Sequence, residues 1–246
     1  IDVRRRMPAN LPATYNLPDI DGSDSFVPRR YREWEQATRE AGGGPSPWSR
    51  FASPNLRSAA VQYYLTSREE VPAVLRAAAG PMVREDPQAL PYARLHGNVQ
   101  VMASKQDLLA ALASPDRLPL VAMTLGEGAP GFNGPPTITP FTTQRLNGNR
   151  LLLEGTAPHP GLLVVAEQFD PGWKARVNGR PARVYPADHL LMGVPLEPGE
   201  HRVELAYAPE SFRVGLFGSL VGLAALIALL LPFRTGRRSS QDSPAR

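Results

Sequence analysis

The chain has 246 residues, with 27 prolines, 21 glycines, no cysteine and 20% charged residues. This length suffices for one large or two small domains with a real core, and the proline and glycine content favours a loop-rich, strand-rich fold over a helical bundle. The absence of cysteine excludes disulfides, thiolate zinc sites and cysteine nucleophiles, and the net charge of +4 comes from scattered arginines without a basic block, so we expect no nucleic acid as a partner.

Residues 1–135 are predicted to form a small extracytoplasmic α+β region. A helix is expected from Pro28 at its first turn through "RRYREWEQATREA" to the glycines at 42–44. The runs "AAVQYYLTS" and "YARLHGNVQVM" are typical of strands. The segment "SKQDLLAALAS" predicts another helix, because Ser104 and Asp107 stand at capping-box spacing before leucines that share one face.

Two short motifs in this region resemble ligand sites but favour loops. The acidic segment "DIDGSD" at 19–24 lacks the ligand spacing of an EF-hand, so we interpret it as a turn. The glycines of "GEGAPG" match a dinucleotide-binding fingerprint by letter. Pro130, Pro135 and Pro136 exclude the helix that would receive a pyrophosphate, so we predict a loop here.

Residues 136–212 are predicted to form an antiparallel β-sandwich. Roughly seven short alternating runs follow one another here, with turns and no helix between them. In the last run, "HRVELAY", Val203, Leu205 and Tyr207 share one face, while Arg202 and Glu204 share the other. One face of this strand is therefore expected to contact water.

The segment "DPGWKARVNGR" at 170–180 sets a tryptophan among cations and raises the question of a sugar, lipid or nucleic-acid site. Gly172 gives the preceding turn its freedom, and Asn178-Gly179 is the preferred sequence of a two-residue type I′ hairpin. Alternation places Trp173 on the core face and Lys174 on the solvent face. We therefore interpret Trp173 as a core anchor, whose change to Ala destabilises the domain severely while Lys174→Ala has little effect.

An uncharged apolar segment, "VGLFGSLVGLAALIALLLPF", follows the β-rich region, and residues 213–233 are predicted to be a transmembrane helix because they can cover a ~30 Å bilayer core. The arginines of the tail at 234–246 place that tail in the cytoplasm and the bulk of the chain outside. Tyr207 and Phe212 are expected near the headgroups. Small residues recur in G-x-x-x-G spacing, at Gly215, Gly218, Ser219 and Gly222. They either form a packing face for another helix or reflect the general frequency of glycine in membrane helices.

No residue pattern in the chain indicates a self-contained active site. The four histidines, His96, His159, His189 and His201, are widely separated and form no metal-binding pair. There is also no G-x-S-x-G elbow and no P-loop. We expect each histidine to be an ordinary strand or loop residue, and we predict no catalytic, cofactor-binding or metal-binding residue.

Several separated stretches together resemble one family. "DIDGSDSFVPRRYREW", "AVQYYLT", "EDPQALPYARL" and, most strongly, residues 162–216 resemble the C-terminal extracytoplasmic region and last transmembrane helix of YfhO-family bacterial membrane proteins. The order and spacing of these stretches carry the resemblance. The chain departs from the family at Tyr92, where arginine is common, and at Asn178, where aspartate is usual.

The resemblance implies a polytopic membrane glycosyltransferase of the GT-C type in the bacterial cell envelope. Such a protein takes a sugar from a polyprenyl-phosphate carrier and adds it to an envelope glycan, and its catalytic carboxylate lies in the first extracytoplasmic loop. The implied partners are the lipid bilayer, the upstream transmembrane helices, the polyprenyl-phosphate sugar and the glycan. Since the chain begins at Ile1 without an initiator methionine, we expect it to be the non-catalytic C-terminal part of such a protein.

A stand-alone, tail-anchored surface module is the alternative. Its β-sandwich would bind glycans or serve a structural role without catalysis. This hypothesis predicts an exposed platform of tryptophan or tyrosine rings on one face.

Overall fold

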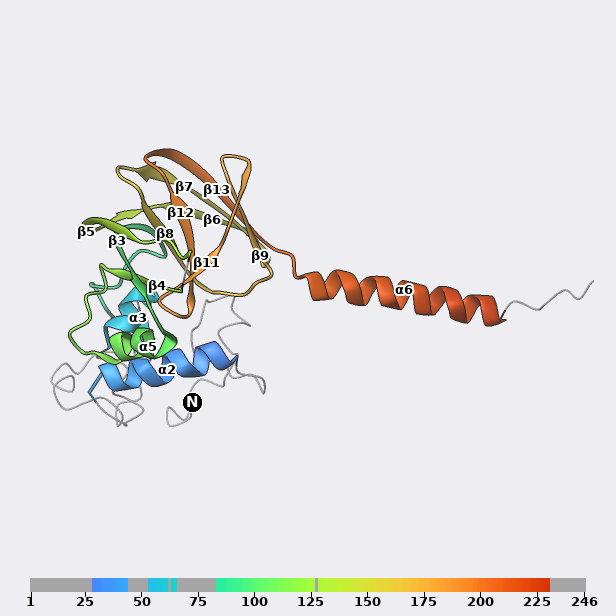
Figure 1. Ribbon diagram of the computed structural model, residues 1–246, viewed down its shortest axis with the longest axis horizontal. Coiled ribbons are helices and arrows are strands. Elements are labelled where there is room, and N and C mark those ends of the chain that lie inside the picture. Colours follow the sequence, from blue (N-terminus) through green and yellow to red (C-terminus); the bar gives the residue numbers. More distant parts are fainter. Residues whose placement is uncertain (1–27, 44–52, 62, 66–82, 127, 231–246) are drawn as a thin grey trace, which may run out of the picture. The chain divides into compact units, whose positions relative to one another are not determined.

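The computed structural model describes residues 28–43, 53–61, 63–65, 83–126 and 128–230 (Figure 1). The chain divides into two compact units, Ile1–Tyr207, which we call the body, and Ala208–Arg246. The described helices of the body are α2 (Arg29–Ala41), α3 (Pro54–Ser58) and α5 (Lys105–Ala113). Its described strands are β1 (Tyr63–Leu65), β2 (Val83–Glu85), β3 (Ala93–Met102), β4 (Ala122–Leu125), β5 (Phe132–Pro140), β6 (Thr142–Asn147), β7 (Arg150–Ala157), β8 (Gly161–Gln168), β9 (Trp173–Val177), β10 (Arg180–Ala182), β11 (Tyr185–Ala187), β12 (Leu191–Leu196) and β13 (Gly199–Tyr207).

Two large sheets form the framework of the body. The first has the order β10-β9-β13-β7-β6, and all its pairs are antiparallel. The second has the order β11-β12-β8-β3-β4, and β5 pairs with the other side of β3. Only its β3–β4 pair is parallel among the described strands of this sheet. Strands β1 and β2 form a separate antiparallel pair.

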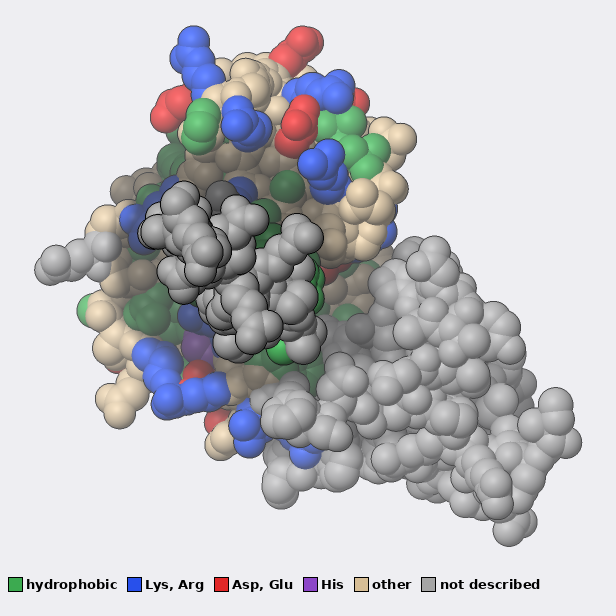
Figure 2. Space-filling view, turned by 90° about the vertical axis from the view of Figure 1, so that its right-hand side faces the viewer, with side chains coloured by type: hydrophobic (Ala, Val, Ile, Leu, Met, Phe, Trp, Pro, Cys, Tyr) green, Lys and Arg blue, Asp and Glu red, His purple; other side chains and the backbone are tan. Residues whose placement is uncertain are grey.

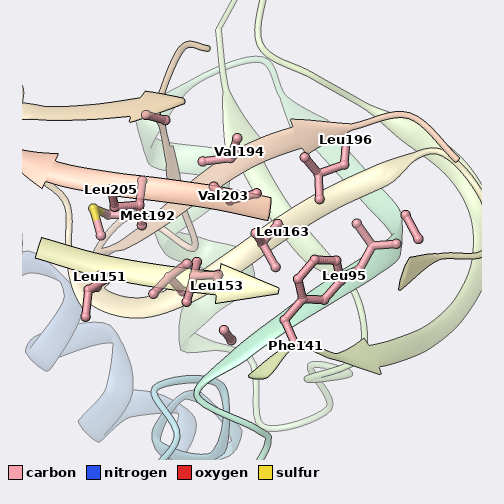
Figure 3. Packing of buried hydrophobic residues seen from close by; sticks show 14 residues of the cluster. Leu95, Phe141, Leu151, Leu153, Leu163, Met192, Val194, Leu196, Val203 and Leu205 are labelled. Atoms are coloured by element: carbon pink, nitrogen blue, oxygen red, sulfur yellow. The ribbon is translucent and has the colours of Figure 1, made fainter. Parts of the chain in front are cut away.

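One apolar core lies between the two large sheets, which therefore pack face to face (Figure 3). Leu95, Leu163 and Val194 come from the second sheet and are fully buried. Leu153 and Val203 meet them from the first sheet and are equally buried. The predicted α+β class is confirmed, with two antiparallel-rich sheets, although the second sheet also includes β3 and β4, which precede the region predicted as a β-sandwich.

The second sheet is also covered on its other face, by helices α2, α3 and α5. Trp34 of α2 and Leu112 of α5 belong to the same buried cluster as Leu162 and Val164 of β8. Alternate residues of β8 thus face the helices and the first sheet, which explains why "GLLVVAEQ" is a continuous apolar run instead of an alternating one. The body has three layers: sheet, sheet and helices (Figure 1).

The outer face of the first sheet contacts solvent. On β13, Arg202 and Glu204 are exposed while Val203 and Leu205 are buried, as predicted. Arg202 pairs with Glu154 of β7 at 3.1 Å. Basic and acidic side chains are interspersed in the upper part of the view in Figure 2.

Helices α2 and α5 begin where the sequence predicted, whereas α3 was not predicted. Pro28 directly precedes α2, whose last residue is followed by Gly42. Ser104 caps α5, and its hydroxyl accepts a hydrogen bond from the Asp107 backbone amide at 3.1 Å. Leu108 and Leu112 are buried one turn apart on that helix. The predicted capping box and the predicted apolar face of α5 are therefore both present.

The β-rich part begins earlier in the chain than the sequence predicted. Strand β5 includes Pro135 and Pro136 and lies partly before residue 136, where the β-rich part was predicted to begin, while the described residues of "GEGAPG" form a loop as predicted. Pro135 and Pro136 are tolerated because β5 pairs only with β3 and is an edge strand, where missing backbone donors face away from the ladder. The 135/136 domain boundary stays a prediction, but the second sheet crosses it, since β3 pairs with β8.

The second unit contains one described helix, α6 (Glu210–Leu230). Its segment Glu210–Ala228 is long and apolar enough to cross a membrane, and none of that segment is buried in the structure. Residues 231–233 of the predicted span and the arginines of the tail lie outside the described residues, as does the acidic segment at 19–24.

Candidate functional site

A shallow hollow of about 290 Å³ opens at one end of the first sheet. Seven described residues line it, and we call it the Trp173 hollow: Gly148, Asn149, Glu167, Gln168, Asp170, Trp173 and Tyr207. They come from the β6–β7 turn, the end of β8, the turn after it, and the ends of β9 and β13. Its size is near the lower end of the ~300–1,000 Å³ of small-molecule sites.

The turn before β9 sets the position of Trp173. The Asp170 side chain accepts a hydrogen bond from the Gly172 amide at 2.7 Å, and the Asp170 carbonyl accepts one from the Trp173 amide at 3.1 Å. This is an Asx-type turn closed by a second backbone bond. Gly172 itself is buried, so the chain reverses closely against the body before β9 begins.

Trp173 is only partly buried and packs against the edge of the core between the sheets. It shares the inward face of β9 with buried Ala175, as predicted, whereas Lys174 is exposed. Because β9 begins at Trp173, the ring is at the margin of the sheet and part of it borders the hollow. The prediction of a core anchor therefore needs adjustment, because one part of the Trp173 ring packs against the core and another part lines the hollow.

Tyr207 forms an aromatic pair with Trp173. The two residues are direct partners in the β9–β13 ladder, and their ring centroids lie 5.4 Å apart at 54°. The Tyr207 amide donates to the Asn149 carbonyl at 2.8 Å. Burial, followed by the nearby Asp170 charge, raises the pKa of Tyr207. Tyr207 is thus held in the body through its ring and its amide.

A second acid at the hollow, Glu167, is held by two partners. It accepts a hydrogen bond from the Tyr92 hydroxyl and forms an ion pair with Arg145, whose guanidinium also donates to the Tyr92 oxygen at 2.9 Å. Burial, together with the Glu167 charge, raises the pKa of Tyr92, which stays a neutral donor. Tyr92, one of the two departures from the family pattern, therefore takes part in fixing this acid.

The hairpin after β9 faces away from the hollow. Asn178 and Gly179 have φ of 50° and 79°, as a type I′ turn requires. The Asn178 side chain accepts from the Arg202 amide at 2.8 Å and donates to the Glu200 carbonyl at 3.3 Å. An aspartate here could accept the first bond but could not donate the second, so asparagine fastens the hairpin to β13 on both sides.

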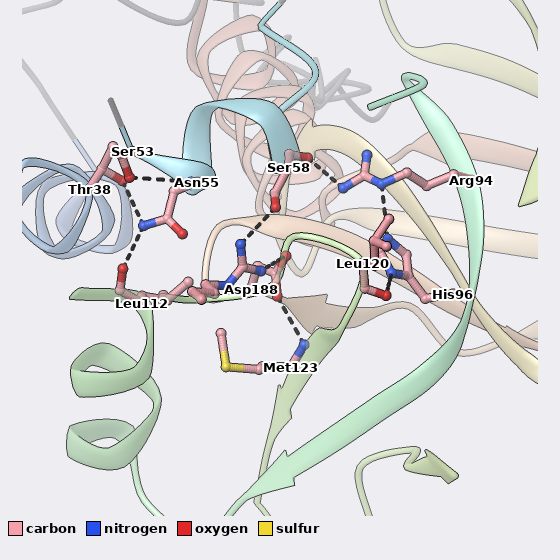
Figure 4. Close-up of polar contacts among 11 residues, drawn as sticks. Thr38, Ser53, Asn55, Ser58, Arg94, His96, Leu112, Leu120, Met123 and Asp188 are labelled. Carbon is pink, nitrogen blue, oxygen red and sulfur yellow. Dashed lines mark hydrogen bonds and ion pairs between the residues drawn. The ribbon is translucent and has the colours of Figure 1, made fainter. Parts of the chain in front are cut away.

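A second polar cluster, the buried arginine network, joins the helical layer to the second sheet (Figure 4). Arg94 is fully buried and donates to the Ser58 carbonyl at 2.5 Å. Arg117 donates to the Ser58 hydroxyl at 2.7 Å and pairs with Asp188 at 2.6 Å. The Asp188 carboxylate also accepts from the Met123 amide of β4 at 2.9 Å. The network is buried, and it connects α3, β3 and β4 with the loops that carry Arg117 and Asp188.

His96 completes this network as a neutral ring. Arg94 Nε donates to His96 Nε2 at 2.9 Å, which makes that nitrogen the acceptor and places the proton on Nδ1, facing the Leu120 carbonyl at 2.9 Å. Burial, and secondly the Arg94 charge, lowers the pKa of His96 to about 4. His96 is a structural strand residue. Among the described residues, no group of three His, Asp or Glu side chains is placed to bind a metal ion.

The small residues of α6 lie on an exposed helix. A Cβ built on Gly215, Gly218 or Gly222 would meet nothing within 4 Å, and the Ser219 hydroxyl donates to the Gly215 carbonyl at 2.9 Å within the helix. The packing role of these four residues stays a prediction.

Sequence reasoning missed the hollow because its walls come from three stretches that lie far apart in the sequence, 148–149, 167–173 and Tyr207. Of its lining residues only Trp173 was singled out as a site candidate, and Tyr207 was expected at the headgroups. The available signal was weak: two aromatic residues at strand ends and an Asx turn between two runs of apolar residues.

A three-layered body joined to an apolar helix of spanning length defines the class, a membrane protein with a large folded domain. Residues 139–219, about a third of the chain, match the model of the family described as "Bacterial membrane protein YfhO". Over 77 residues the chain is also 27% identical to "Uncharacterized protein YfhO" of Bacillus subtilis (strain 168). That alignment covers 31% of this chain and 9% of the relative. The resemblance to this family is thus confirmed for the β-rich part of the chain and the start of α6.

Solved structures of one large mycobacterial protein are also similar. The cryo-EM structure titled arabinofuranosyltransferase AftD from Mycobacteria is 26% identical, with a TM-score of 0.31, over 44% of this chain and 8% of that one. A mutant form of the same protein is 27% identical, with a TM-score of 0.31, over 41% of this chain and 9% of that one. Scores this low do not define a common fold.

Proposed function

We propose that this chain is the C-terminal part of a polytopic, glycosyltransferase-like membrane protein. The complete protein transfers a sugar from a polyprenyl-phosphate donor to a cell-envelope acceptor. The observation that carries the proposal is the YfhO-family match, which runs without a break from β5 through the first sheet and into the first half of α6. Because the aligned segment spans only 9% of the curated relative, the catalytic part is assigned to the rest of the protein.

In this proposal the body is a non-catalytic domain outside the cytoplasm, and α6 is the last membrane helix. The arginine-rich tail that follows α6 supports this orientation, because short basic flanks are retained in the cytoplasm. The small residues of α6 pack against upstream helices of the same protein, since they allow close approach of helix backbones.

The first experiment reads the coding sequence upstream of Ile1 and follows sugar transfer in membranes. We expect a run of hydrophobic helices upstream, and transfer of labelled sugar from a polyprenyl-phosphate donor that is lost when the gene is deleted. A start codon at Ile1 without upstream helices, or unchanged transfer after deletion, would reject the proposal and leave the tail-anchored surface module.

The second experiment measures orientation. Single cysteines replace exposed residues of the body, such as Gln144, or residues of the tail in this cysteine-free chain, and intact cells are treated with a membrane-impermeant maleimide. We expect labelling of the body and protection of the tail. The opposite pattern would contradict an extracytoplasmic body.

A further inference from the structure

We propose that the Trp173 hollow is a subsite for one uncharged sugar ring of a glycan chain. A sugar has C–H groups on its ring faces and hydroxyls around its rim, so a binding site combines an aromatic surface with hydrogen-bonding groups beside it. The hollow has both in one place. That the sugar belongs to the acceptor glycan rests on the proposed function, whereas sugar binding itself does not.

The aromatic part is pre-organised by the fold. Trp173 and Tyr207 are held by the β9–β13 ladder, the Asx turn and the hydrogen bond from the Tyr207 amide to the Asn149 carbonyl. Their rings are tilted by 54°, so they form an angled wall and not a flat row. Both rings are partly exposed, and little conformational entropy remains to be lost when a ligand contacts them.

The polar part suits hydroxyl groups. The side chains of Asn149 and Gln168 are exposed at the hollow, and each amide offers two donors and an acceptor. Asp170 and Glu167 supply carboxylate oxygens that accept hydrogen bonds from sugar hydroxyls, which are charge-assisted and stronger than neutral ones.

The charge of the lining restricts the ligand class. Two of the seven lining residues are acids and none is Lys, Arg or His. Glu167 is neutralised by Arg145, whereas Asp170 takes part in no ion pair among the described residues. A phosphorylated sugar or a uronic acid would bring like charge against Asp170, so both are disfavoured. A bare organic cation is less suited than a sugar, because only this one carboxylate could balance its charge and it already accepts a hydrogen bond from the Gly172 amide.

Binding is tested with the complete 246-residue chain in lipid nanodiscs. The probes are uncharged methyl hexosides and pentosides, with a uronate, a sugar phosphate and tetramethylammonium as competitors. We expect at least one uncharged glycoside to bind with a dissociation constant on the order of millimolar, measured by saturation-transfer NMR and calorimetry. Ring C–H protons should receive the strongest saturation, since they face the indole.

Three variants connect binding to the hollow. Asn149→Ala removes an exposed amide and Tyr207→Phe removes only a hydroxyl; each should weaken binding about 5-fold. Trp173→Phe keeps an aromatic ring for the core and should weaken binding by a similar factor. Gln144→Ala removes an exposed amide on the neighbouring strand β6, away from the lining residues, and should change nothing.

The outcomes separate this inference from the proposed function. The subsite would be overturned if no uncharged glycoside binds, or if the Asn149 and Tyr207 variants bind glycosides as tightly as the unchanged chain. A preference for the sugar phosphate, the uronate or tetramethylammonium would also overturn it. Transfer activity in membranes that persists together with such a result would leave the proposed function standing. Glycoside binding in the absence of any transfer activity would support the subsite and reject the transferase.

Discussion

The change Asp188→Asn isolates the contribution of one buried charge to the stability of the body. Asp188 is 1% exposed and its partner Arg117 is 4% exposed, with 2.6 Å between the charged groups. Asparagine has nearly the same size, tolerates the φ of 46° at this position and still accepts a hydrogen bond from the Met123 amide. The substitution therefore changes little except the charge, and it leaves the Arg117 guanidinium buried without a counter-ion.

Breaking a buried pair by removing one partner costs ~3–5 kcal/mol. For a body of about two hundred residues, each kcal/mol corresponds to ~2–4 °C in Tm, so we expect a fall of roughly 6–20 °C. Thermal unfolding of the complete chain, followed by circular dichroism in mild detergent, measures it. Hydrogen exchange provides a local reading, because the Met123 amide in β4 should lose protection first.

Two further variants complete the design. The surface pair Arg202–Glu154 has side chains that are 58% and 52% exposed, so Arg202→Gln is the matched control, with an expected loss below about 1 kcal/mol. Adding Arg117→Met to Asp188→Asn removes the lone buried charge and should recover much of the lost stability. If Asp188→Asn costs no more than Arg202→Gln, the network does not hold the helical layer to the sheet.

The remaining predictions concern one histidine, one tryptophan and one glycine of the body. The pKa of His96 is lowered to about 4 in the folded protein, whereas the histidine of an unfolded chain takes up its proton near pH 6.5. The free energy of unfolding should therefore fall as the pH decreases, by about 2 kcal/mol at pH 5 relative to pH 7. Urea unfolding that does not depend on pH would contradict this. Trp173→Ala should lower the free energy of unfolding by about 2 kcal/mol, less than the ~3–5 kcal/mol of a fully enclosed tryptophan, because the ring is only partly buried. A loss above 4 kcal/mol in the same urea assay would show that Trp173 belongs wholly to the core. Gly155→Ala should lower the free energy of unfolding by ~1–3 kcal/mol, because the new Cβ would lie 2.8 Å from the buried Phe141 ring. As a control, the Cβ of Gly148→Ala would meet nothing within 4 Å, so this variant should leave thermal unfolding unchanged.

Local signals predicted the elements well. The capping box at Ser104 and the proline–glycine boundaries of α2 each depend on neighbours within one turn, and the structure shows them where expected. The alternation on β13 separated core from solvent correctly at Val203 and Arg202. These patterns are readable because one element and one solvent boundary determine them.

Features that depend on distant pairing could not be predicted. Arg94 and Arg117 look like ordinary surface cations, because charged side chains are almost never fully buried unless paired. Their partners, Ser58 and Asp188, are 36 and 71 residues away along the chain, respectively. The insertion of β3 between β8 and β4 likewise follows from contacts that no local period encodes.

The candidate site shows the same limit. Alternation on β9 predicted which way Trp173 points, and the structure agrees. It could not show that the strand begins at Trp173, or that the register with β13 places Tyr207 beside it. Whether an inward-facing aromatic side chain is enclosed or borders a hollow depends on how far the neighbouring strands extend past it. The sequence of a single strand does not contain that information.

The central position of β8 constrains how this domain can be inherited. The family-matched segment 139–219 includes β8 but lacks β3, β4 and the three described helices of the body. If a gene rearrangement moved this segment alone, Leu162 and Val164 would lose the helices that bury them and would be exposed to solvent. One edge of β8 would also lose its partner strand β3. Such a product would be prone to aggregate through its bare edge. The smallest portion that can pass intact between proteins therefore also includes the described N-terminal helices, which lie more than a hundred residues upstream of β8 in the case of α2 and α3.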